Sequence, residues 1–473
     1  SGNTFNDWGN LTSRVGASDI GGLIADNTIN IVGSPPLEVA QGTVRLDSTW
    51  TSAAGNPYVW YGNVAIEGTD GVDGVTSTPI VFGDQVFFGS WDGYLRSVDL
   101  ADGQLHWETL LTTGAGAGVM VDATPTIYGN SVFIGDGQGD FHSVNRTTGA
   151  VQWSVSLDAH PFARIFGSPV VIDDRIIIGV ASYELAVPLP DYTFRGSVVA
   201  LDRSTGAELW RTYTTENDAT AGAGVSVWST AAVDRSRGLI FIGTGNTYEE
   251  PAAPLSDALL ALDYATGSIE WSRQFTEGDV YTIFGTPPQG PDADIGAAPN
   301  LFSIGGQDVV GVGDKAGVYA VLDRDTGDTV WARELAPGSP LGGVMTSSVY
   351  VDGAIYVSTN QMVDPYNFTS SVNTSLTSAL DASDGSILWQ TTVPASSFGA
   401  LSYANGVLFQ PTTPGDLYAI DADDGSVLWS DDLGADVGGG ASISDGTVLA
   451  PYGFWFFTSP PNPIGGVVAY RPA

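Results

Sequence analysis

The sequence predicts an all-β protein, a single eight-bladed β-propeller, from three observations: a tandem repeat, four extended runs in each repeat, and an unmatched strand at each end. The repeat has an acidic or amide residue, then Gly four positions later and Trp eight positions later. Self-similarity at a period of tens of residues is typical of a repeat fold. The seven copies are Asp99/Gly103/Trp107, Asn145/Gly149/Trp153, Asp202/Gly206/Trp210, Asp263/Gly267/Trp271, Asp323/Gly327/Trp331, Asp381/Gly385/Trp389 and Asp421/Gly425/Trp429.

Each copy of the repeat predicts a β-hairpin. Its Gly follows Thr or Asp, a pair that suits a tight turn with positive φ at the glycine. The apolar run before the turn and the Trp-bearing run after it are the two strands. Two further β-rich runs precede them, for example 168–172 and 175–179 before 197–201. Four strands with one Trp on the last fit a propeller blade whose indole packs against its neighbour.

The two ends of the chain predict how the ring closes. An eighth Trp, Trp50, lacks the turn, and the C-terminal run 466–470 is a third strand without a fourth. If the N-terminal strand around Trp50 completes the last blade, no sheet edge stays open. Residues 1–473 then form one domain, although the length alone would allow about three.

The charge balance excludes some partners. Asp and Glu total 53 against 16 Lys and Arg, and such a surface repels nucleic acid and anionic membranes. No apolar run is long enough to span a bilayer. The acidity indicates either solubility in salty water or a dock for a basic partner such as a c-type cytochrome. We favour solubility because the charge is spread over every blade.

Insertions collect on one predicted face of the ring. In a four-stranded blade, the second-to-third connections and the links between blades share a face. These connections carry almost every insertion: residues 182–195, 247–257, 276–293, 361–377 and 454–464. Insertions gathered on one face of a repeat fold mark its working face, so a ligand site is expected there.

Lys315 is the one lysine of the chain, which has fifteen arginines. It follows the second strand of the fifth blade and therefore belongs to the insertion-rich face. A chain that otherwise avoids Lys but keeps one here suggests a site that needs a compact ammonium. An incidental lysine on a turn would give the same pattern.

Several segments around Lys315 resemble the dehydrogenases that use pyrroloquinoline quinone (PQQ). The match is to the PQQ-dependent, or quinoprotein, alcohol dehydrogenase family, most closely the polyvinyl alcohol dehydrogenase type. It covers nearly all the chain and is densest from blade three to blade five. The segments that carry it are TFRGSVVALD at 193–202, VWS at 227–229, GTGN at 243–246, SDA at 256–258, GPDADIG at 290–296 and GDKAG at 313–317.

The resemblance implies quinoprotein-type, Trp-docking blades and five site residues. Glu184 and Asn246 match the family's calcium-binding glutamate and asparagine. Asp294 matches the carboxylate that touches calcium and acts as the catalytic base. Trp228 matches the indole that floors the quinone, and Lys315 matches the Lys or Arg that hydrogen-bonds the reactive quinone oxygens.

These residue types suit the implied chemistry. Calcium prefers oxygen ligands, which two carboxylates and an amide supply, and it would withdraw electron density from the quinone carbonyl that accepts hydride. Lys315 would stabilise the negative charge of the reduced quinone. Trp228 offers a flat apolar floor. Asp294 would take the alcohol proton as hydride leaves the carbon.

Structural explanations stay open for these residues. Asn246 could hold a left-handed turn, Trp228 could be a core indole, and Glu184 could be a solvated loop carboxylate. Asp294 is close in sequence to Asp292 and Asp279, so the base is the least secure assignment, with Asp279 as its rival. Together on one face, the five residues favour the functional interpretation.

The chain departs from the family pattern in its lack of cysteine. Family members commonly carry a vicinal Cys pair near the cofactor, and Asp191 and Tyr192 stand at those positions, which puts the roof over the quinone in doubt. No Cys-x-x-Cys-His segment is present, so electrons are expected to pass to an external acceptor such as a c-type cytochrome. The aromatic residues at 452–457 would line a hydrophobic substrate groove or pack a lid.

We therefore expect a PQQ- and calcium-dependent alcohol dehydrogenase that acts on a primary alcohol, a secondary alcohol or a hydroxylated polymer. A periplasmic or secreted location is expected, with a signal peptide already removed. Two other classes stay open: a propeller that binds proteins as a scaffold, and a structural surface protein whose acidic repeats hold calcium. Neither explains a single lysine beside calcium-type carboxylates.

Overall fold

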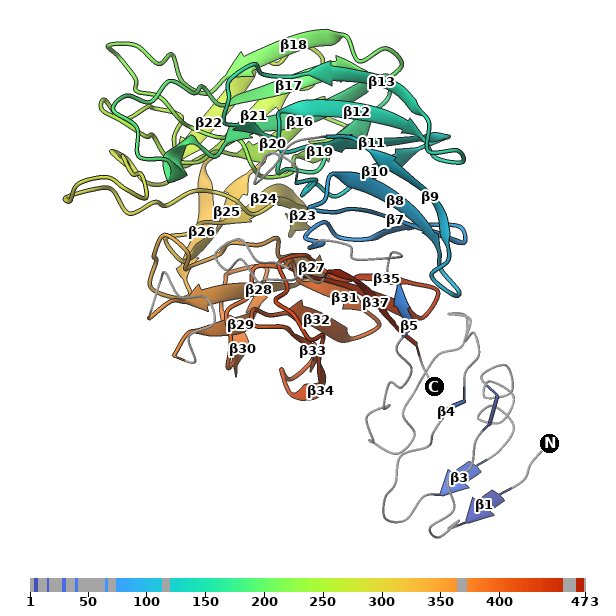
Figure 1. Ribbon diagram of the computed structural model, residues 1–473. Coiled ribbons are helices and arrows are strands. Elements are labelled where there is room, and N and C mark those ends of the chain that lie inside the picture. The colour runs from blue at the N-terminus through green and yellow to red at the C-terminus, as the bar shows by residue number, and fades with distance from the viewer. Residues whose placement is uncertain are drawn as a thin grey trace.

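The computed structural model describes residues 74–112, 120–363, 372–453 and 465–471, together with short strands at 4–6, 15–16, 28–30, 39–40 and 64–66. Eight antiparallel sheets form a ring (Figure 1), which confirms the predicted all-β, eight-bladed propeller. No helix among the described residues is long and apolar enough to cross a bilayer.

The first seven blades follow one another along the chain, and each keeps its four main strands in sequence order; blade three has one additional two-residue strand outside that order. Blades one to four contain β6 (Ile80–Phe82), β7 (Gln85–Gly89), β8 (Tyr94–Asp99) and β9 (Leu105–Leu110); β10 (Thr126–Tyr128), β11 (Ser131–Gly135), β12 (Asp140–Asn145) and β13 (Val151–Ser156); β14 (Ala163–Arg164), β15 (Val170–Ile172), β16 (Arg175–Ser182), β17 (Ser197–Asp202) and β18 (Glu208–Tyr213); and β19 (Ala232–Asp234), β20 (Leu239–Gly243), β21 (Ala258–Asp263) and β22 (Ile269–Gln274). Blades five to seven contain β23 (Asn300–Ile304), β24 (Gln307–Gly313), β25 (Val318–Asp323) and β26 (Thr329–Glu334); β27 (Val349–Val351), β28 (Ala354–Gln361), β29 (Thr374–Asp381) and β30 (Ile387–Val393); and β31 (Ser402–Ala404), β32 (Val407–Pro411), β33 (Asp416–Asp421) and β34 (Val427–Asp432).

The eighth blade combines both ends of the chain. β35 (Ser442–Ser444), β36 (Thr447–Tyr452) and β37 (Gly466–Tyr470) are joined by β5 (Val64–Ile66), which pairs antiparallel with β37. Residues 64–66 supply the closing strand, whereas the segment around Trp50, predicted for this position, lies outside the described residues. Two short parallel pairs precede it: β1 (Thr4–Asn6) with β3 (Thr28–Asn30), and β2 (Val15–Gly16) with β4 (Val39–Ala40).

The repeated Asp, Gly and Trp each have a separate physical role in a blade. Asp202 Oδ1 accepts hydrogen bonds from the N–H groups of Ser204 and Thr205 at 3.0 and 2.9 Å, which fixes the turn. Gly206 in the same turn has φ +74°. A Cβ on Gly206 would lie 2.7 Å from Cε3 of Trp153, the indole of the preceding blade. The repeat therefore specifies both the hairpin and its contact with its neighbour.

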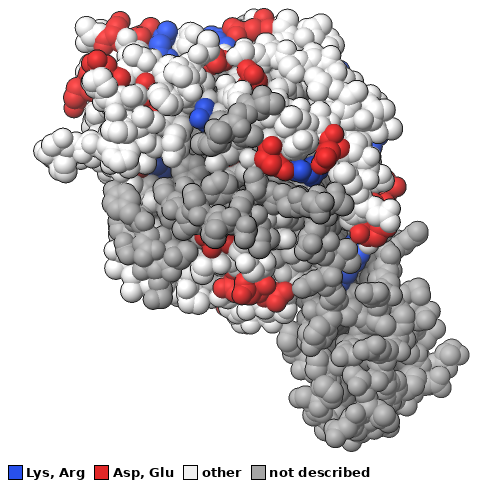
Figure 2. Space-filling model, viewed as in Figure 1, with Lys and Arg blue, Asp and Glu red and all other residues white. Residues whose placement is uncertain are grey.

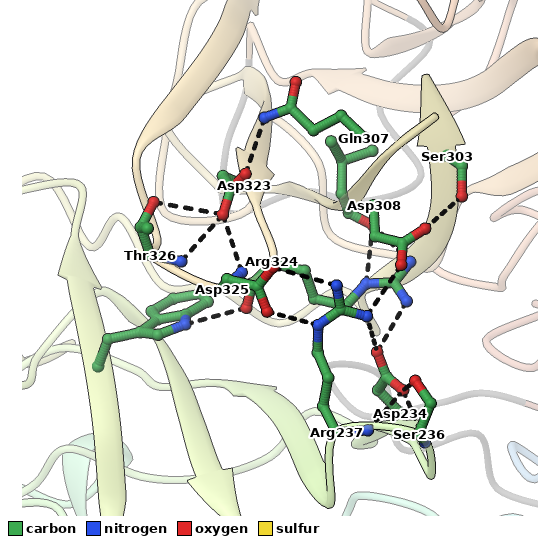
Figure 3. Close-up of polar contacts among 12 residues, drawn as sticks. Asp234, Ser236, Arg237, Ser303, Gln307, Asp308, Asp323, Arg324, Asp325 and Thr326 are labelled. Atoms are coloured by element: carbon green, nitrogen blue, oxygen red, sulfur yellow. Dashed lines mark hydrogen bonds and ion pairs between the residues drawn. The ribbon is translucent and has the colours of Figure 1, made fainter. Parts of the chain in front are cut away.

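A polar cluster joins blades four and five at the short-connection face (Figure 3). Asp234, at the end of β19, accepts from Arg324 Nη1 at 2.8 Å and from Arg237 Nη1 at 3.0 Å. Arg237 also pairs with Asp308 at 2.9 Å and with Asp325 at 2.6 Å. The cluster lies at the face opposite the long connections and links two blades independently of them.

The long connections are where the repeat pattern predicts them. The turn between β15 and β16 occupies residues 173–174, whereas the β16–β17 and β22–β23 connections occupy 183–196 and 275–299. In Figure 1 the long connections of blades three to five extend to the left of the ring. In Figure 2 acidic side chains lie in several separate groups, so the charge of this view is not gathered in one patch.

Candidate active site

Four of the five predicted site residues come together where blades four and five meet the insertion-rich face. Asn246 follows β20 and Lys315 follows β24, whereas Trp228 and Asp294 precede β19 and β23. Because second-strand ends and links between blades open on the same face, the chain places all four around one end of the ring.

Asp294 is the centre of this group. Its Oδ1 accepts the backbone N–H of Asn246 at 2.7 Å. Its Oδ2 accepts from Trp228 Nε1 at 3.0 Å and from Lys315 Nζ at 2.9 Å. One carboxylate thus fixes the indole, the ammonium and the Gly-Thr-Gly-Asn turn relative to one another.

Lys315 is a buried ammonium rather than a solvated one. It is 7% exposed and donates to Asp292 Oδ1 and Asp294 Oδ2, both at 2.9 Å. Burial by itself would lower its pKa, but the two carboxylates more than offset this and raise the pKa of Lys315 above its usual range. Nζ lies 5.5 Å from the centroid of the half-buried Trp228 ring, so the site has a permanent positive charge beside an indole.

Two buried carboxyl groups near this centre have raised pKa values. Burial raises the pKa of Asp292 to about 8 despite the nearby Lys315. Asp257 is fully buried, neither of its oxygens has a hydrogen-bond partner, and burial together with Asp294 raises its pKa to about 10. Asp257 lies in the SDA segment, but nothing in its local sequence marks it as unpaired.

Asp279, the predicted rival base, fastens the loop that carries Asp292 and Asp294. Its two oxygens accept the backbone N–H groups of Asp292 and Ala293 at 3.3 and 2.7 Å. A Cβ on Gly290 would lie 2.0 Å from Asp279 Oδ1, so a glycine is needed for this close approach. Asp279 therefore acts on the loop backbone.

Glu184 stands apart from the other four residues and contacts none of them directly. It is 1% exposed, in the short 3₁₀ helix η2 (Glu184–Ala186). Its oxygens accept the backbone N–H groups of Thr193 and Phe194, both at 2.9 Å, and its Oε1 lies 3.3 Å from His160 Nε2. The structure thus excludes the solvated-carboxylate interpretation of Glu184.

The side chain of Asn246 has a defined orientation. Its Nδ2 donates to the carbonyl oxygens of Thr247 and Tyr281 at 2.7 and 2.8 Å. Because both amide hydrogens are directed at backbone oxygens, the side-chain oxygen is left as an acceptor or ligand. Asn246 is also only 2% exposed. A residue needed only for a left-handed turn would not have to be buried.

The residue types suit a hard cation beside a planar quinone, although Glu184 stands apart from Asn246 and Asp294. Two carboxylates and an oriented amide oxygen are the ligands calcium prefers, and Trp228 with Lys315 presents an indole next to a fixed cation. In the ranges the structure describes, no three His, Asp or Glu side chains are spaced to hold a metal ion, and the predicted set does not depend on such a triplet. At the positions of the family's Cys pair, Asp191 is exposed and the ring of Tyr192 lies 6.0 Å from that of Tyr248.

Two family models match different parts of the chain. The model described as "PQQ: Glucose/ethanol/alcohol dehydrogenase, beta-propeller domain" matches residues 147–342, the segment that contains all five predicted site residues. The model described as "Outer membrane protein assembly factor BamB" matches residues 53–189 and 372–459, which include only Glu184 of the five.

A polyvinylalcohol dehydrogenase of a Pseudomonas species is 34% identical over 214 residues, 40% of this chain and 33% of that protein. The predicted resemblance to the quinoprotein alcohol dehydrogenases is confirmed. The chain spans about a third of the length of that relative.

Solved structures share the propeller architecture at low sequence identity. The quinohemoprotein alcohol dehydrogenase of Comamonas testosteroni superposes with a TM-score of 0.72 at 19% identity, over 90% of this chain and 78% of that one. BamB of Moraxella catarrhalis reaches a TM-score of 0.57 at 16% identity, over 87% and 99%. Since both kinds of protein share the fold, only the residues of the site can distinguish their functions.

Proposed function

We propose that this protein is a PQQ- and calcium-dependent alcohol dehydrogenase. One observation carries the proposal: Asp294 accepts hydrogen bonds from both Trp228 and Lys315, inside the segment matched by the alcohol dehydrogenase model. A buried ammonium beside the half-buried indole contributes little to stability, because two carboxylates must also be buried to hold it. It is a suitable device for recognising a flat, electron-accepting ring.

The residues divide the work by their chemistry. PQQ, when bound, supplies the two-electron acceptor. Trp228 supports its ring, and Lys315 stabilises negative charge beside it. Glu184, Asn246 and Asp294 supply oxygen ligands for calcium. Asp294 accepts the proton of the alcohol hydroxyl.

Asp292 is a second candidate for the base. Asp294 already accepts three hydrogen bonds, which weaken it as a proton acceptor, whereas Asp292 accepts one, from Lys315. Asp292 shares the same ammonium and lies two residues away. Substituting each of the two carboxylates by its amide distinguishes the two candidate proton acceptors.

The proposal is tested by binding before activity. Metal-stripped protein is titrated with PQQ by calorimetry, with and without calcium. We expect binding only with calcium because the protein oxygens and the quinone share the ion. Loaded protein should then reduce an artificial dye when given primary alcohols, secondary alcohols or polyvinyl alcohol. Equal PQQ affinity without calcium would contradict the shared ion, and no binding at all would contradict the proposed function.

A scaffold function is the second candidate, favoured by the BamB-type match over residues 53–189 and 372–459. A scaffold would not need the Lys315, Asp292 and Asp294 cluster, which lies outside both matched ranges. The PQQ titration therefore separates the two candidates.

Substrate, acceptor and location extend the proposal. We propose an alcohol substrate, with a hydroxylated polymer as one option suggested by the polyvinylalcohol dehydrogenase relatives. An external acceptor of the c-type cytochrome kind would reoxidise the cofactor, in line with relatives named for cytochrome c. A periplasmic or secreted location is part of the same proposal.

A further inference from the structure

Blades three and five place charged side chains at equivalent positions of the chain: Arg164 in blade three and Asp294 in blade five. Asp294 lies six residues before Asn300, where β23 begins. Arg164 lies six residues before Val170, where β15 begins. The two side chains are thus attached at equivalent points of their blades.

Backbone pairing supports this equivalence. Val170 pairs with Ile177, and Asn300 pairs with Gly311. Four residues beyond these partners, Ala181 pairs with Arg164, while the N–H of Lys315 donates to Asp294 O at 3.0 Å. Each blade therefore hydrogen-bonds the equivalent position in the same way.

Blade four connects the two positions. Its equivalent residue is Ser226, six residues before Ala232, where β19 begins. Ser226 Oγ accepts the N–H of Ser182 from blade three at 3.1 Å. Ser226 O accepts the N–H of Gly245, beside Asn246, at 2.8 Å. Arg164 therefore belongs to the same end of the ring as the predicted cofactor site.

Arg164 is a buried cation without an ion-pair partner among the described residues. It is 8% exposed, and its guanidinium makes one hydrogen bond, from Nη1 to Ala163 O at 2.7 Å. A guanidinium has five N–H donors, and burying one that is unpaired is costly. Every other strongly buried arginine described, such as Arg324 on Asp234, pairs with a carboxylate.

The nearest carboxylates are occupied by other groups. Asp136 Oδ1 accepts the backbone N–H of Asp140 at 3.0 Å, and its Oδ2 lies 3.0 Å from His142 Nε2. Asp122 Oδ1 accepts the hydroxyl of Thr76 at 2.9 Å. Both carboxylates act on Arg164 only through space. They leave its donors available to a ligand.

We propose that Arg164 binds a carboxylate of the quinone cofactor. A planar guanidinium with free parallel N–H groups matches a carboxylate in two-point contact, and PQQ carries carboxylates on its ring system besides the quinone oxygens. This inference rests on the proposed function. It adds a binding residue in blade three, opposite in charge to Asp294 at the equivalent position of blade five.

The test compares cofactor affinity with stability in the full chain containing calcium. Arg164→Met keeps an unbranched apolar stem but removes the guanidinium and its charge, and Arg195→Met is the control. Arg195 is a half-buried arginine of the same face that stacks on Tyr213 and bonds Thr215 O at 2.8 Å. We expect Arg164→Met to weaken PQQ binding by on the order of ten- to a hundredfold without loss of thermal stability. Arg164→Lys should recover part of the affinity, and Arg195→Met should keep it.

A second probe isolates the carboxylate. PQQ trimethyl ester lacks the anionic groups, so the wild-type protein and Arg164→Met should bind it with similar affinity. If the wild-type protein binds PQQ and Arg164→Met binds it equally well, the Arg164 assignment is wrong and the proposed function survives. If Arg164→Met lowers the melting temperature but leaves the PQQ affinity unchanged, Arg164 is a structural cation, and its assignment as a cofactor-binding residue is wrong. If the wild-type protein does not bind PQQ, both proposals fail.

Discussion

At the scale of single residues, the partners of the Lys315 ammonium organise the site. This ammonium contacts both Asp292 and Asp294 at 2.9 Å, so either carboxylate could accept the proton of a bound alcohol. Their surroundings differ: Asp294 bonds the indole and the Asn246 N–H as well, whereas Asp292 has only the ammonium. Substitution can therefore separate proton transfer from positioning.

Asp294→Asn should lower turnover by on the order of a hundredfold or more. The amide oxygen can still ligate calcium and accept hydrogen bonds, but the proton acceptor is lost. Dye reduction measures the turnover, and cofactor absorbance shows whether PQQ is retained. Asp292→Asn is the matched variant. If it is inactive while Asp294→Asn keeps turnover, Asp292 is the base and Asp294 only a ligand.

Lys315→Met should reduce both stability and activity. It leaves two buried carboxylates without their cation, a change that costs about 3 kcal/mol or more in comparable buried pairs. Lys315→Arg preserves the charge and should recover most of the stability. Urea unfolding of the calcium-free, cofactor-free protein measures this directly. Unchanged unfolding of Lys315→Met would mean that the ammonium does not hold the carboxylates together.

At the scale of elements, a Trp packed on a Gly locks each of blades one to six to the blade that follows it. Trp210 of blade three lies over Gly267 of blade four, and its Nε1 donates to Tyr264 O at 3.1 Å. Thr212 Oγ1 donates to Gly267 O at 2.6 Å. The glycine is required twice, for its φ of +76° and for its lack of a Cβ.

Gly267→Ala should therefore destabilise the protein more than Gly238→Ala. Gly238 has nearly the same φ, +73°, but nothing within 4 Å of an added Cβ, whereas a Cβ on Gly267 would lie 2.5 Å from Trp210 Cε3. Backbone strain costs about 1–2 kcal/mol in both, and displacing the indole adds about 1–3 kcal/mol in Gly267→Ala. Thermal unfolding of the two variants gives the difference. Equal losses would show that the indole contributes nothing to blade docking.

The sequence predicts the blades because their signal is local. Asp202 caps its own turn and Gly206 takes its own φ, so a short pattern is enough to place each hairpin. The closing strand at 64–66 has no such turn or Trp, and the sequence pointed instead to Trp50. The eight-bladed fold can thus be predicted from the repeats. The strand that closes the ring cannot, because it is defined by pairing between the N-terminal β5 and the C-terminal β37.

The functional site is harder to predict from the sequence than the blades, because the role of each residue depends on contacts with residues distant in the sequence. The resemblance picked out Lys315 and Asp294, but not that they form an ion pair with each other. The resemblance included Asp257 in the SDA segment but gave it no role, and it did not include Arg164. Their unpaired side chains depend on how the folded loops and blades surround them: both oxygens of Asp257 are buried without a hydrogen bond, and Asp136 of blade two acts on Arg164 of blade three only through space.

At the scale of the whole molecule, the two faces of the ring carry opposite kinds of charge cluster. The site face buries carboxylates whose pKa values are raised, whereas the opposite face holds Asp234 between two arginines (Figure 3). Burial alone would raise the pKa of Asp234. Hydrogen bonds from Ser236, Arg324 and Arg237 more than offset it and hold that pKa well below its usual range.

The Asp234 cluster should make the contact between blades four and five sensitive to acid. A carboxylate with a lowered pKa in the folded state stabilises the fold at pH values above its unfolded pKa of about 3.9, and this contribution is lost as the pH falls below that value. Asp234→Asn should thus cost about 3 kcal/mol at pH 7. The difference from wild type should shrink as the pH falls from about 5 toward 3.

The control for this prediction is Asp325→Asn, which removes the exposed partner of Arg237. Asp325 pairs with the same arginine at 2.6 Å, but its side chain is 63% exposed, so its loss should cost on the order of 1 kcal/mol or less at any pH. Urea unfolding of the three proteins at several pH values separates burial from pairing. A constant difference between Asp234→Asn and wild type down to pH 3 would mean that Asp234 does not titrate with folding. The acid sensitivity of the ring would then have to come from another carboxylate.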